Sequence, residues 1–132
     1  MNSFLAPIPK IHFDSAIDIL KAKDFVLFGS DASEFFNNLE TGIKCLIYLS
    51  HDQAEPVVLY EAVYQGLVRN AEEMHALEAQ GFRPSTAVGE KWGFYWKISE
   101  VKKLPQPIEL SSIKTKSGKY LKSFPRGPVA VI

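Results

Sequence analysis

The sequence predicts a small domain of the mixed α/β (α+β) class, with a curved and mainly antiparallel sheet. Its 132 residues are 46% hydrophobic and 12% aromatic, which is typical of one globular domain with its own core, here spanning residues 1–132. Helix and strand signals follow one another in the order βαβαββαββ, without the strict one-to-one alternation that a doubly wound parallel sheet requires. Composition and element order together predict the fold class.

Each expected element has its own local signal. The first strand contains Pro7 and is followed by Pro9, which suits an edge position because proline cannot donate to a β-ladder. Asp14 or Ser15 would cap the first helix. In chain order, the expected elements are a strand over 3–8, a helix over 14–22, a strand over 25–28, a helix over 31–41, strands over 43–49 and 57–68, a helix over 70–80, a strand over 92–101 that ends before Pro105 and Pro107, and a last strand over 129–132.

Capping patterns mark the second and third helices. Asp31 is followed three residues later by Glu34, and Asn70 is followed in the same way by Glu73. This spacing is typical of a capping box, in which the first side chain accepts a hydrogen bond from the backbone of the fourth residue. Gly42 and Gly81 directly follow these two helices, as is common at helix C-termini.

The two middle strands are predicted from side-chain alternation and composition. In the stretch 43–49, Cys45 shares one face with three aliphatic residues. That face should be buried, so Cys45 is interpreted as a small core residue rather than a nucleophile. The stretch 57–68, VVLYEAVYQGLV, is rich in β-branched and aromatic residues, and its Gly66 predicts a bulge or bend.

The segment WGFYWKISEV contains the densest group of aromatic residues. Alternation places Trp92 and Trp96 on one face of the expected strand, and Tyr95 and Lys97 on the other. Two interpretations remain open. The aromatic residues fill the core of a small sheet, or some of them form a platform on which a base turned out of its strand is stacked.

The net charge of zero hides an asymmetry along the chain. Residues 1–96 carry seven Lys and Arg against thirteen Asp and Glu, a balance of −6, whereas residues 97–132 carry eight against two, a balance of +6. A basic C-terminal segment on an acidic domain would direct a polyanion to one face. The alternative is an ordinary solvated surface on which the two signs are interspersed.

Several function classes lack a signal in the sequence. The three histidines are far apart, and one cysteine cannot form a Cys-rich zinc cluster, so no metal site is expected. Neither a nucleophile elbow nor a glycine-rich phosphate loop is present, so no cofactor is expected. No apolar run reaches membrane-spanning length, and prolines interrupt the N-terminal apolar stretch, so we expect a cytoplasmic protein without a membrane partner.

Three segments carry a resemblance to a known family. Residues 42–50, GIKCLIYLS, resemble the "GD-x-hydrophobic-x-x-Tyr-x-Ser" strand of EVE domains in the PUA-like superfamily, with Ile43 where an acidic residue usually follows the glycine. Residues 63–66, VYQG, resemble the strand after it. Residues 95–114 are similar to the "strand, then Pro, then Leu-x-x-Leu/Ile-Lys" passage of EVE and ASCH domains, although the Gly-x-Lys-x-x-Glu signature of ASCH domains is missing. The resemblance, over residues 24–114, implies a PUA-like pseudo-barrel flanked by short helices, with a cleft for RNA or a modified nucleobase.

The resemblance and the charge asymmetry lead to a first hypothesis, a non-catalytic module that binds nucleic acid, either RNA or a modified base. Aromatic side chains would stack on the base, small polar groups would bind its edge, and basic side chains would meet phosphates. The expected ligand-binding residues are Phe28, Gly29, Ser30, Ser50, Trp92, Tyr95 and Lys97, and the expected phosphate-binding residues are Lys119, Lys122 and Arg126.

Two hypotheses from other classes remain open. A small enzyme acting on a nucleoside or an acylated amine would need a catalytic residue such as Lys44, Glu61 or Lys97 in the cleft. A protein-interaction domain or accessory subunit would need no such cleft. The position of the C-terminal basic residues relative to the largest cleft distinguishes these hypotheses from the first.

Overall fold

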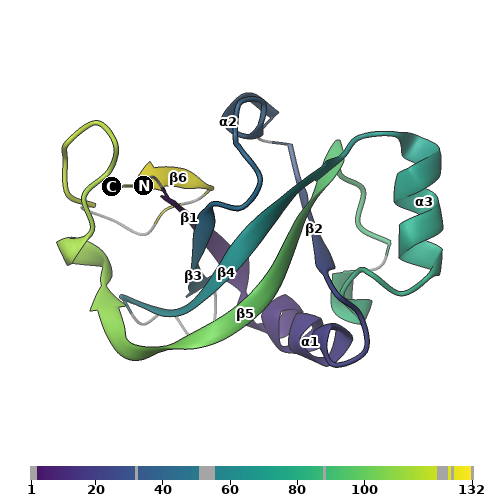
Figure 1. Ribbon diagram of the computed structural model, residues 1–132, viewed down its shortest axis with the longest axis horizontal. Coiled ribbons are helices and arrows are strands. Elements are labelled where there is room, and N and C mark those ends of the chain that lie inside the picture. The colour runs from purple at the N-terminus through teal and green to yellow at the C-terminus, as the bar shows by residue number, and fades with distance from the viewer. Residues whose placement is uncertain are drawn as a thin grey trace.

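The strands of the protein form one six-stranded sheet in the order β2-β5-β4-β3-β1-β6 (Figure 1). The computed structural model describes residues 3–31, 33–50, 56–87, 89–121, 125 and 127–131. The strands are β1 (Ser3–Pro9), β2 (Val26–Ser30), β3 (Lys44–Ser50), β4 (Val57–Val68), β5 (Phe94–Glu109) and β6 (Val129–Val131). The helices are α1 (Lys10–Leu20), α2 (Ser33–Phe36) and α3 (Ala71–Ala79), with two 3-10 turns, η1 (Ser85–Ala87) and η2 (Leu110–Ser112). The predicted order βαβαββαββ is confirmed.

The sheet is mainly antiparallel, as predicted, and it curls. Only β1 and β3 run parallel among the described neighbours; the other pairs are antiparallel. Long strands β4 and β5 cross the whole molecule (Figure 1). β2 forms one edge and β1 lies next to the other edge, yet Phe4 of β1 and Phe28 of β2 belong to one buried cluster. The sheet therefore bends until its two ends share a core.

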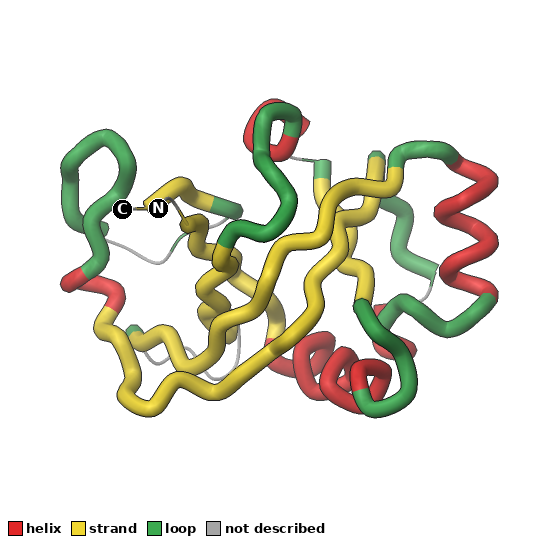
Figure 2. The backbone as a smooth tube through the Cα atoms, viewed as in Figure 1, coloured by secondary structure: helices red, strands yellow, loops and turns green. Residues whose placement is uncertain are grey.

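Buried side chains lie on both faces of the sheet. The inner face packs against Phe13 of α1 and Phe36 of α2. On the outer face, Tyr48 and its neighbours are covered by Leu110 and the segment after it. At the other end of the sheet, Met74 and Leu77 of α3 pack against Tyr95, and Figure 2 shows this helix beside the ends of the long strands. The helices thus close parts of each face and leave other parts without a helix.

Strand β3 is buried more completely than its alternation predicts. Cys45 and Ile47 lie in the inner cluster, which confirms the predicted buried face. Cys45 has no exposed surface, and burial raises the pKa of its thiol above the ordinary range, so it is a core residue as predicted. Leu46 and Tyr48, on the opposite face, are buried as well. The C-terminal segment covers them, and no local pattern in β3 reveals this long-range contact.

Two helix starts differ from the sequence prediction. α1 begins at Lys10, directly after Pro9, and not at Asp14 or Ser15. Asp14 instead forms an ion pair with Lys10 at 2.7 Å, one turn earlier in the helix. The predicted second helix is reduced to the single turn α2, and Asp31 Oδ1 accepts a hydrogen bond from the Gly93 N–H at 2.8 Å. Tertiary partners have replaced local capping in this region.

Strand β5 does not end before its prolines, contrary to the prediction. It continues through Pro105 and Pro107 to Glu109. Its pairing with β4 shifts register there, from Val58 opposite Ile108 to Tyr60 opposite Lys103. Proline is tolerated at such an irregularity because its missing N–H is not needed by the ladder. In addition, β2 pairs only with the first five residues of β5. Pro105 and Pro107 therefore lie where β5 is an edge strand.

Other local signals are confirmed in the structure. β4 spans the predicted residues, and its register shifts between Tyr64 and Gly66, where Gly66 has a φ of 109°. Asn70 caps α3, since its side chain accepts a hydrogen bond from the Glu73 N–H at 3.0 Å. In the described part of the chain, no helix is both long and apolar enough to cross a bilayer.

Candidate functional site

A pocket of about 1240 Å³ lies where the two ends of the curled sheet meet. Its walls come from the C-terminal ends of β1, β2 and β3, the first turn of α1, and the segment from Arg83 to Trp92. Phe36, Trp96, Pro125, Gly127 and Pro128 complete the lining. Elements that are distant in sequence therefore converge on one hollow.

The pocket exists because the second half of β1 has a strand on one side only. β6 pairs with Ser3, Phe4 and Leu5, whereas β3 pairs with β1 along its whole length. Among the described residues, no strand pairs with the other side of residues 6–9, and these residues line the pocket. Pro7 and Pro9 suit this place, since neither has an N–H to leave unpaired. The edge character predicted from these prolines is confirmed for this half of β1.

The aromatic ring of Trp92 lies at the pocket, and two glycines, Gly29 and Gly93, determine its position. A Cβ atom on Gly29 would collide with the Trp92 indole, so the ring lies directly against the backbone of β2. The next residue, Gly93, donates its N–H to Asp31 Oδ1 at the end of β2. Trp92 nevertheless remains 39% exposed. The result is an indole that lies against β2, lines the pocket and remains partly exposed.

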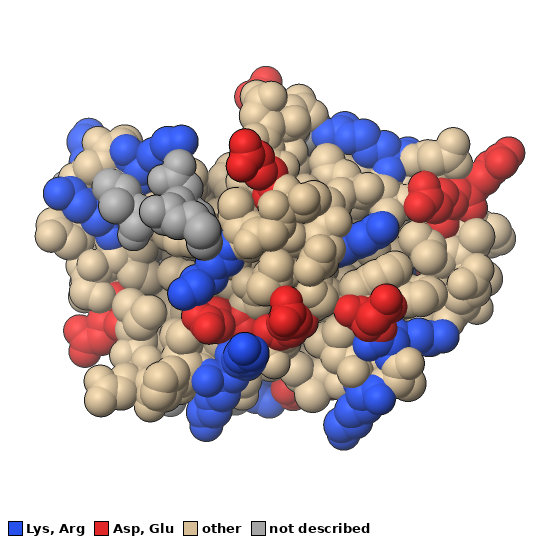
Figure 3. Space-filling model, viewed as in Figure 1, with Lys and Arg blue, Asp and Glu red and all other residues tan. Residues whose placement is uncertain are grey.

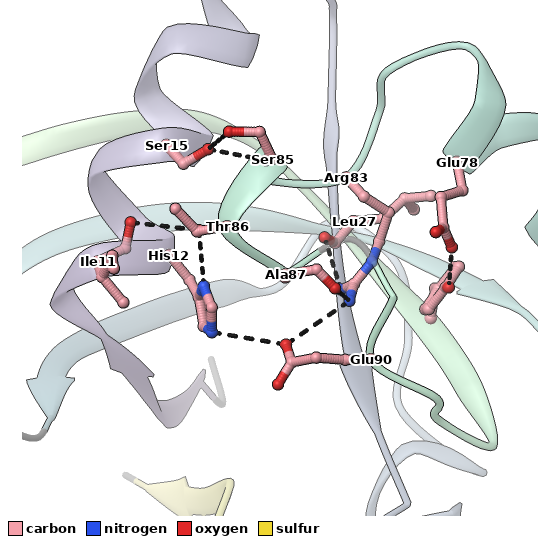
Figure 4. Close-up of polar contacts among 11 residues, drawn as sticks. Ile11, His12, Ser15, Leu27, Glu78, Arg83, Ser85, Thr86, Ala87 and Glu90 are labelled. Carbon is pink, nitrogen blue, oxygen red and sulfur yellow. Dashed lines mark hydrogen bonds and ion pairs between the residues drawn. The ribbon is translucent and has the colours of Figure 1, made fainter.

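A polar wall lies on the side of the pocket formed by α1 and the segment after α3 (Figure 4). Thr86 Oγ1 is 2.7 Å from His12 Nδ1. On the other side of the imidazole ring, Nε2 is 3.5 Å from Glu90 Oε1. The same Glu90 oxygen is 4.0 Å from Arg83 Nη2. One carboxylate oxygen therefore lies between two nitrogen groups and contacts neither at short range.

The Arg83 guanidinium is buried, with only 3% of the residue exposed. Its Nη2 donates to the Ala87 carbonyl at 3.0 Å and its Nη1 to the Leu27 carbonyl at 3.4 Å. The guanidinium also lies over the Tyr95 ring, 4.6 Å from the centroid. These contacts fix the charge in place, but the carbonyls and the ring carry no formal negative charge.

Five of the seven expected ligand-binding residues line the pocket. They are Phe28, Gly29, Ser30, Ser50 and Trp92. Phe28 is nearly buried, and its ring lies 5.4 Å from that of Trp96, so it forms part of the apolar floor. Trp92 is the more accessible of the two rings.

Tyr95 and Lys97 are the exceptions, and the structure places both on the opposite face of β5. Tyr95 is only 4% exposed, packs beneath α3, and donates its hydroxyl to Glu78 Oε2 at 2.6 Å. Burial, followed by this hydrogen bond, raises the pKa of Tyr95. Lys97 Nζ lies 4.8 Å from the centroid of the Phe25 ring. The predicted alternation is correct for these two residues, but it directs both side chains away from the pocket. It is wrong for Trp92, because β5 begins only at Phe94 and the Trp92 indole lies on the Tyr95 side of β2, at the position of a Cβ on Gly29.

The basic C-terminal residues that the structure describes do not gather at the pocket. Lys119 belongs to the loop closed by the bridge between Lys114 and Tyr120, and it is not part of the lining. Lys122 and Arg126 lie outside the described residues. On β4 and β5, Lys102 faces Glu61 across the ladder. Figure 3 shows basic and acidic side chains interspersed along the middle of this face, whereas mostly basic side chains gather at its left end, over the C-terminal loop.

The residues considered for catalysis do not meet in the pocket either. Lys44 pairs with Glu61 at 3.2 Å across β3 and β4, outside the lining. In the described part of the chain, no group of three or more His, Cys, Asp or Glu side chains could hold a metal ion.

Sequence reasoning missed most of the polar wall. His12, Arg83 and Glu90 come from three separate segments, and no spacing rule connects them. Arg83 appears in the sequence as a single charge in a loop after a helix. Its burial against Tyr95 marks it as unusual, but this burial is visible only in the folded structure and not in the sequence.

The comparison with known proteins adds no relative to this geometry, because the sequence matches no family model and no curated protein.

Proposed function

We propose that this chain is a non-catalytic, cytoplasmic nucleic-acid-binding module of the PUA-like type, closest to EVE domains, and that its pocket receives a nucleobase from RNA or modified DNA. The observation that carries the proposal is Trp92, an indole that is fixed against Gly29 and yet 39% exposed at the pocket. An exposed aromatic ring on a rigid support is the usual platform for an unstacked base.

The dimensions and lining of the pocket support a ligand of this kind. Its volume of about 1240 Å³ exceeds what a single base requires. The floor is apolar, with Phe28 and Trp96, and Ser30 and Ser50 bring hydroxyl groups to the rim. Such a combination of an apolar body with a few polar groups suits the flat face and polar edge of a base.

The fold also supports the PUA-like assignment. A curled, mainly antiparallel sheet with short helices is the architecture that the resemblance implies. Two residues of the resemblance motif, Tyr48 and Ser50, line the pocket. The motif and the pocket thus coincide on β3. Since the described C-terminal lysines do not line the pocket, the proposal rests on the aromatic platform rather than on charge.

The test is a binding screen read by tryptophan fluorescence. Trp92 and Trp96 are the two tryptophans of the chain, and only Trp92 is exposed, so a stacked base should quench mainly its emission. The ligands are nucleosides, modified nucleosides, and short RNA and DNA strands. Trp92→Ala should weaken binding by about 5- to 150-fold, since base stacking on an aromatic ring contributes about 1–3 kcal/mol.

The matched control is Tyr120→Ala, because Tyr120 is another exposed aromatic residue, at 57%, away from the pocket. This variant should bind as the wild type does. Binding that is unchanged in Trp92→Ala, or equally weakened in both variants, would contradict the proposal.

A further inference from the structure

We infer that the polar wall of the pocket is an oxyanion site, occupied here by the carboxylate of Glu90, and that the ligand is a nucleotide whose phosphate takes the place of this carboxylate. The inference rests on the proposed function, because it specifies the ligand class of the same pocket. Three observations lead to it: the environment of Arg83, the position of Glu90 Oε1, and the start of α1 (Figure 4).

Arg83 is a buried cation without a close counter-charge among the described residues. Its nearest carboxylate oxygen, on Glu90, is 4.0 Å away. Its Nε is buried and has no hydrogen-bond partner in the described part of the chain. Burying an ion is costly unless an opposite charge approaches closely. The guanidinium therefore favours an anion that contacts it at a shorter distance than Glu90 does.

Glu90 marks the position that such an anion would occupy. Its Oε1 lies between His12 Nε2, at 3.5 Å, and Arg83 Nη2, at 4.0 Å. Both distances exceed the 2.7–2.9 Å of a strong charge-assisted hydrogen bond. The Glu90 side chain is 44% exposed, so it can move into solvent without leaving a cavity. A phosphate has more acceptor oxygens than one carboxylate and can contact both nitrogen groups at once.

The first turn of α1 favours an anion in the same pocket. Pro9 precedes the helix without a side-chain cap, and the first turn has no acidic residue. Pro9, Lys10 and His12 all line the pocket. The first N–H groups of a helix and the positive end of its dipole stabilise negative charge near a helix start. Lys10 is already paired with Asp14 at 2.7 Å, so the backbone and His12 are the groups on α1 that remain for the ligand.

The oxyanion position is close to the aromatic platform in the chain. Glu90 and Trp92 are two residues apart, so their Cα atoms are at most about 7 Å apart, and both residues line the pocket. A ligand that stacks its base on Trp92 then needs only a sugar-sized spacer to place a phosphate at the Glu90 carboxylate position. This geometry favours a nucleotide over a free nucleoside.

The decisive variant is Glu90→Gln, which removes the charge of an exposed side chain and retains its shape. We measure the affinity of the full chain for inorganic phosphate, a nucleoside, its 5′-monophosphate and a dinucleoside monophosphate. Loss of the competing charge should strengthen the binding of phosphate and of the 5′-monophosphate by roughly tenfold. The affinity for the nucleoside should not change. If the 5′-monophosphate gains affinity and the dinucleoside monophosphate does not, the site binds a terminal phosphate. If both gain affinity, the site binds a phosphate within a chain.

The matched control is Glu72→Gln on α3, which makes the same change in net charge at an exposed residue outside the pocket. It should leave all four affinities unchanged. Arg83→Met should reduce the phosphate affinity and spare the nucleoside; if this variant does not fold, Glu90→Gln alone decides. The inference is overturned if Glu90→Gln binds phosphate and the 5′-monophosphate no more tightly than Glu72→Gln does.

The two proposals fail in different ways. If nucleoside binding depends on Trp92 but a phosphate adds nothing, in the wild type or in Glu90→Gln, the oxyanion site is wrong and the base platform stands. If Glu90→Gln strengthens phosphate binding while Trp92→Ala has no effect on any nucleoside, the oxyanion site stands and the proposed function is wrong.

Discussion

The two faces of the sheet where β2 meets β5 differ in what covers them. On one face, Leu27 and Tyr95 are buried beneath Met74 and Leu77 of α3. On the other face, the buried Trp96 lines the pocket. Trp92 reaches the same pocket from the Tyr95 side of β2, because its indole lies where a Cβ on Gly29 would point and Gly29 is paired with Tyr95. Both faces are rich in aromatic residues, yet one has become core and the other has remained open.

The difference teaches that composition does not distinguish a platform from a core, whereas the covering element does. α3 supplies apolar side chains to the Tyr95 face. The pocket face receives the polar segment with Arg83 and Glu90 instead. Arg83 connects the two faces, because its guanidinium lies over the Tyr95 ring and also lines the pocket. The predictions below alter one face at a time.

The largest expected effect separates the two tryptophans. Trp96→Ala should reduce the free energy of unfolding by about 3–5 kcal/mol, because Trp96 is only 5% exposed and packs against the rings of Phe4, Phe28 and Phe36. Trp92→Ala should cost about 1 kcal/mol or less, since its ring is 39% exposed. Urea denaturation of both variants checks this. Equal losses would show that Trp92 belongs to the core and is not available for stacking.

Gly29→Ala tests whether the pocket face depends on the seating of Trp92. The added Cβ would collide with the indole and displace it, so nucleoside binding should weaken by about tenfold or more. Stability should fall by about 1–3 kcal/mol through local overpacking. Fluorescence reports the displacement of Trp92.

The control for that variant is Gly127→Ala, because a Cβ at Gly127 meets nothing within 4 Å among the described residues although Gly127 also lines the pocket. It should retain both binding and emission. If Gly29→Ala binds nucleosides as well as Gly127→Ala does, the close contact between Gly29 and Trp92 has no role in the platform.

The fold was predictable where a single segment determines its own structure. Asn70 and Glu73 mark the start of α3, and Gly66 marks the bulge in β4, because capping and bulge geometry depend on neighbours within a few residues. The prediction failed at Pro105 and Asp31, where distant strands decide. Proline excludes a ladder hydrogen bond, but only the tertiary pairing shows whether one was required.

The residues of the candidate site were likewise predictable only in part. Trp92 and Gly29 were proposed from the aromatic segment and the family resemblance, and both line the pocket. Tyr95 was assigned to the ligand although it lies under α3, since alternation specifies a face and not what covers it. The wall of His12, Arg83 and Glu90 was missed because its members are joined only by the folded chain.

On the α3 face, Tyr95→Phe should have a smaller effect that depends on pH. Near pH 7 it should cost about 1 kcal/mol, because the hydrogen bond to Glu78 is lost. The pKa of Tyr95 is raised in the folded state above its ordinary value of 10.0. The wild type therefore loses this tyrosine's contribution to stability as the pH rises above about 10, and the variant does not. Denaturation at pH 7 and pH 11 should show that the difference in free energy of unfolding between the two proteins is smaller at pH 11. A larger difference at pH 11 would contradict the assignment.

The smallest effect is expected for Lys97→Met, which tests whether a basic residue outside the pocket takes part in binding. Methionine retains the apolar stem and removes the charge that lies 4.8 Å from the centroid of the Phe25 ring. The loss of this cation–π contact should cost about 0.5–1 kcal/mol of stability. Affinity for short RNA, and the slope of its logarithm against that of the salt concentration, should remain those of the wild type, because Lys97 lies on the face opposite the pocket. If Lys97 instead met a phosphate, affinity would fall for all sequences alike and the slope would decrease in magnitude by about 0.7. Titration at three salt concentrations distinguishes these results, and the second one would move the phosphate-binding surface from the pocket to the outer face of β5.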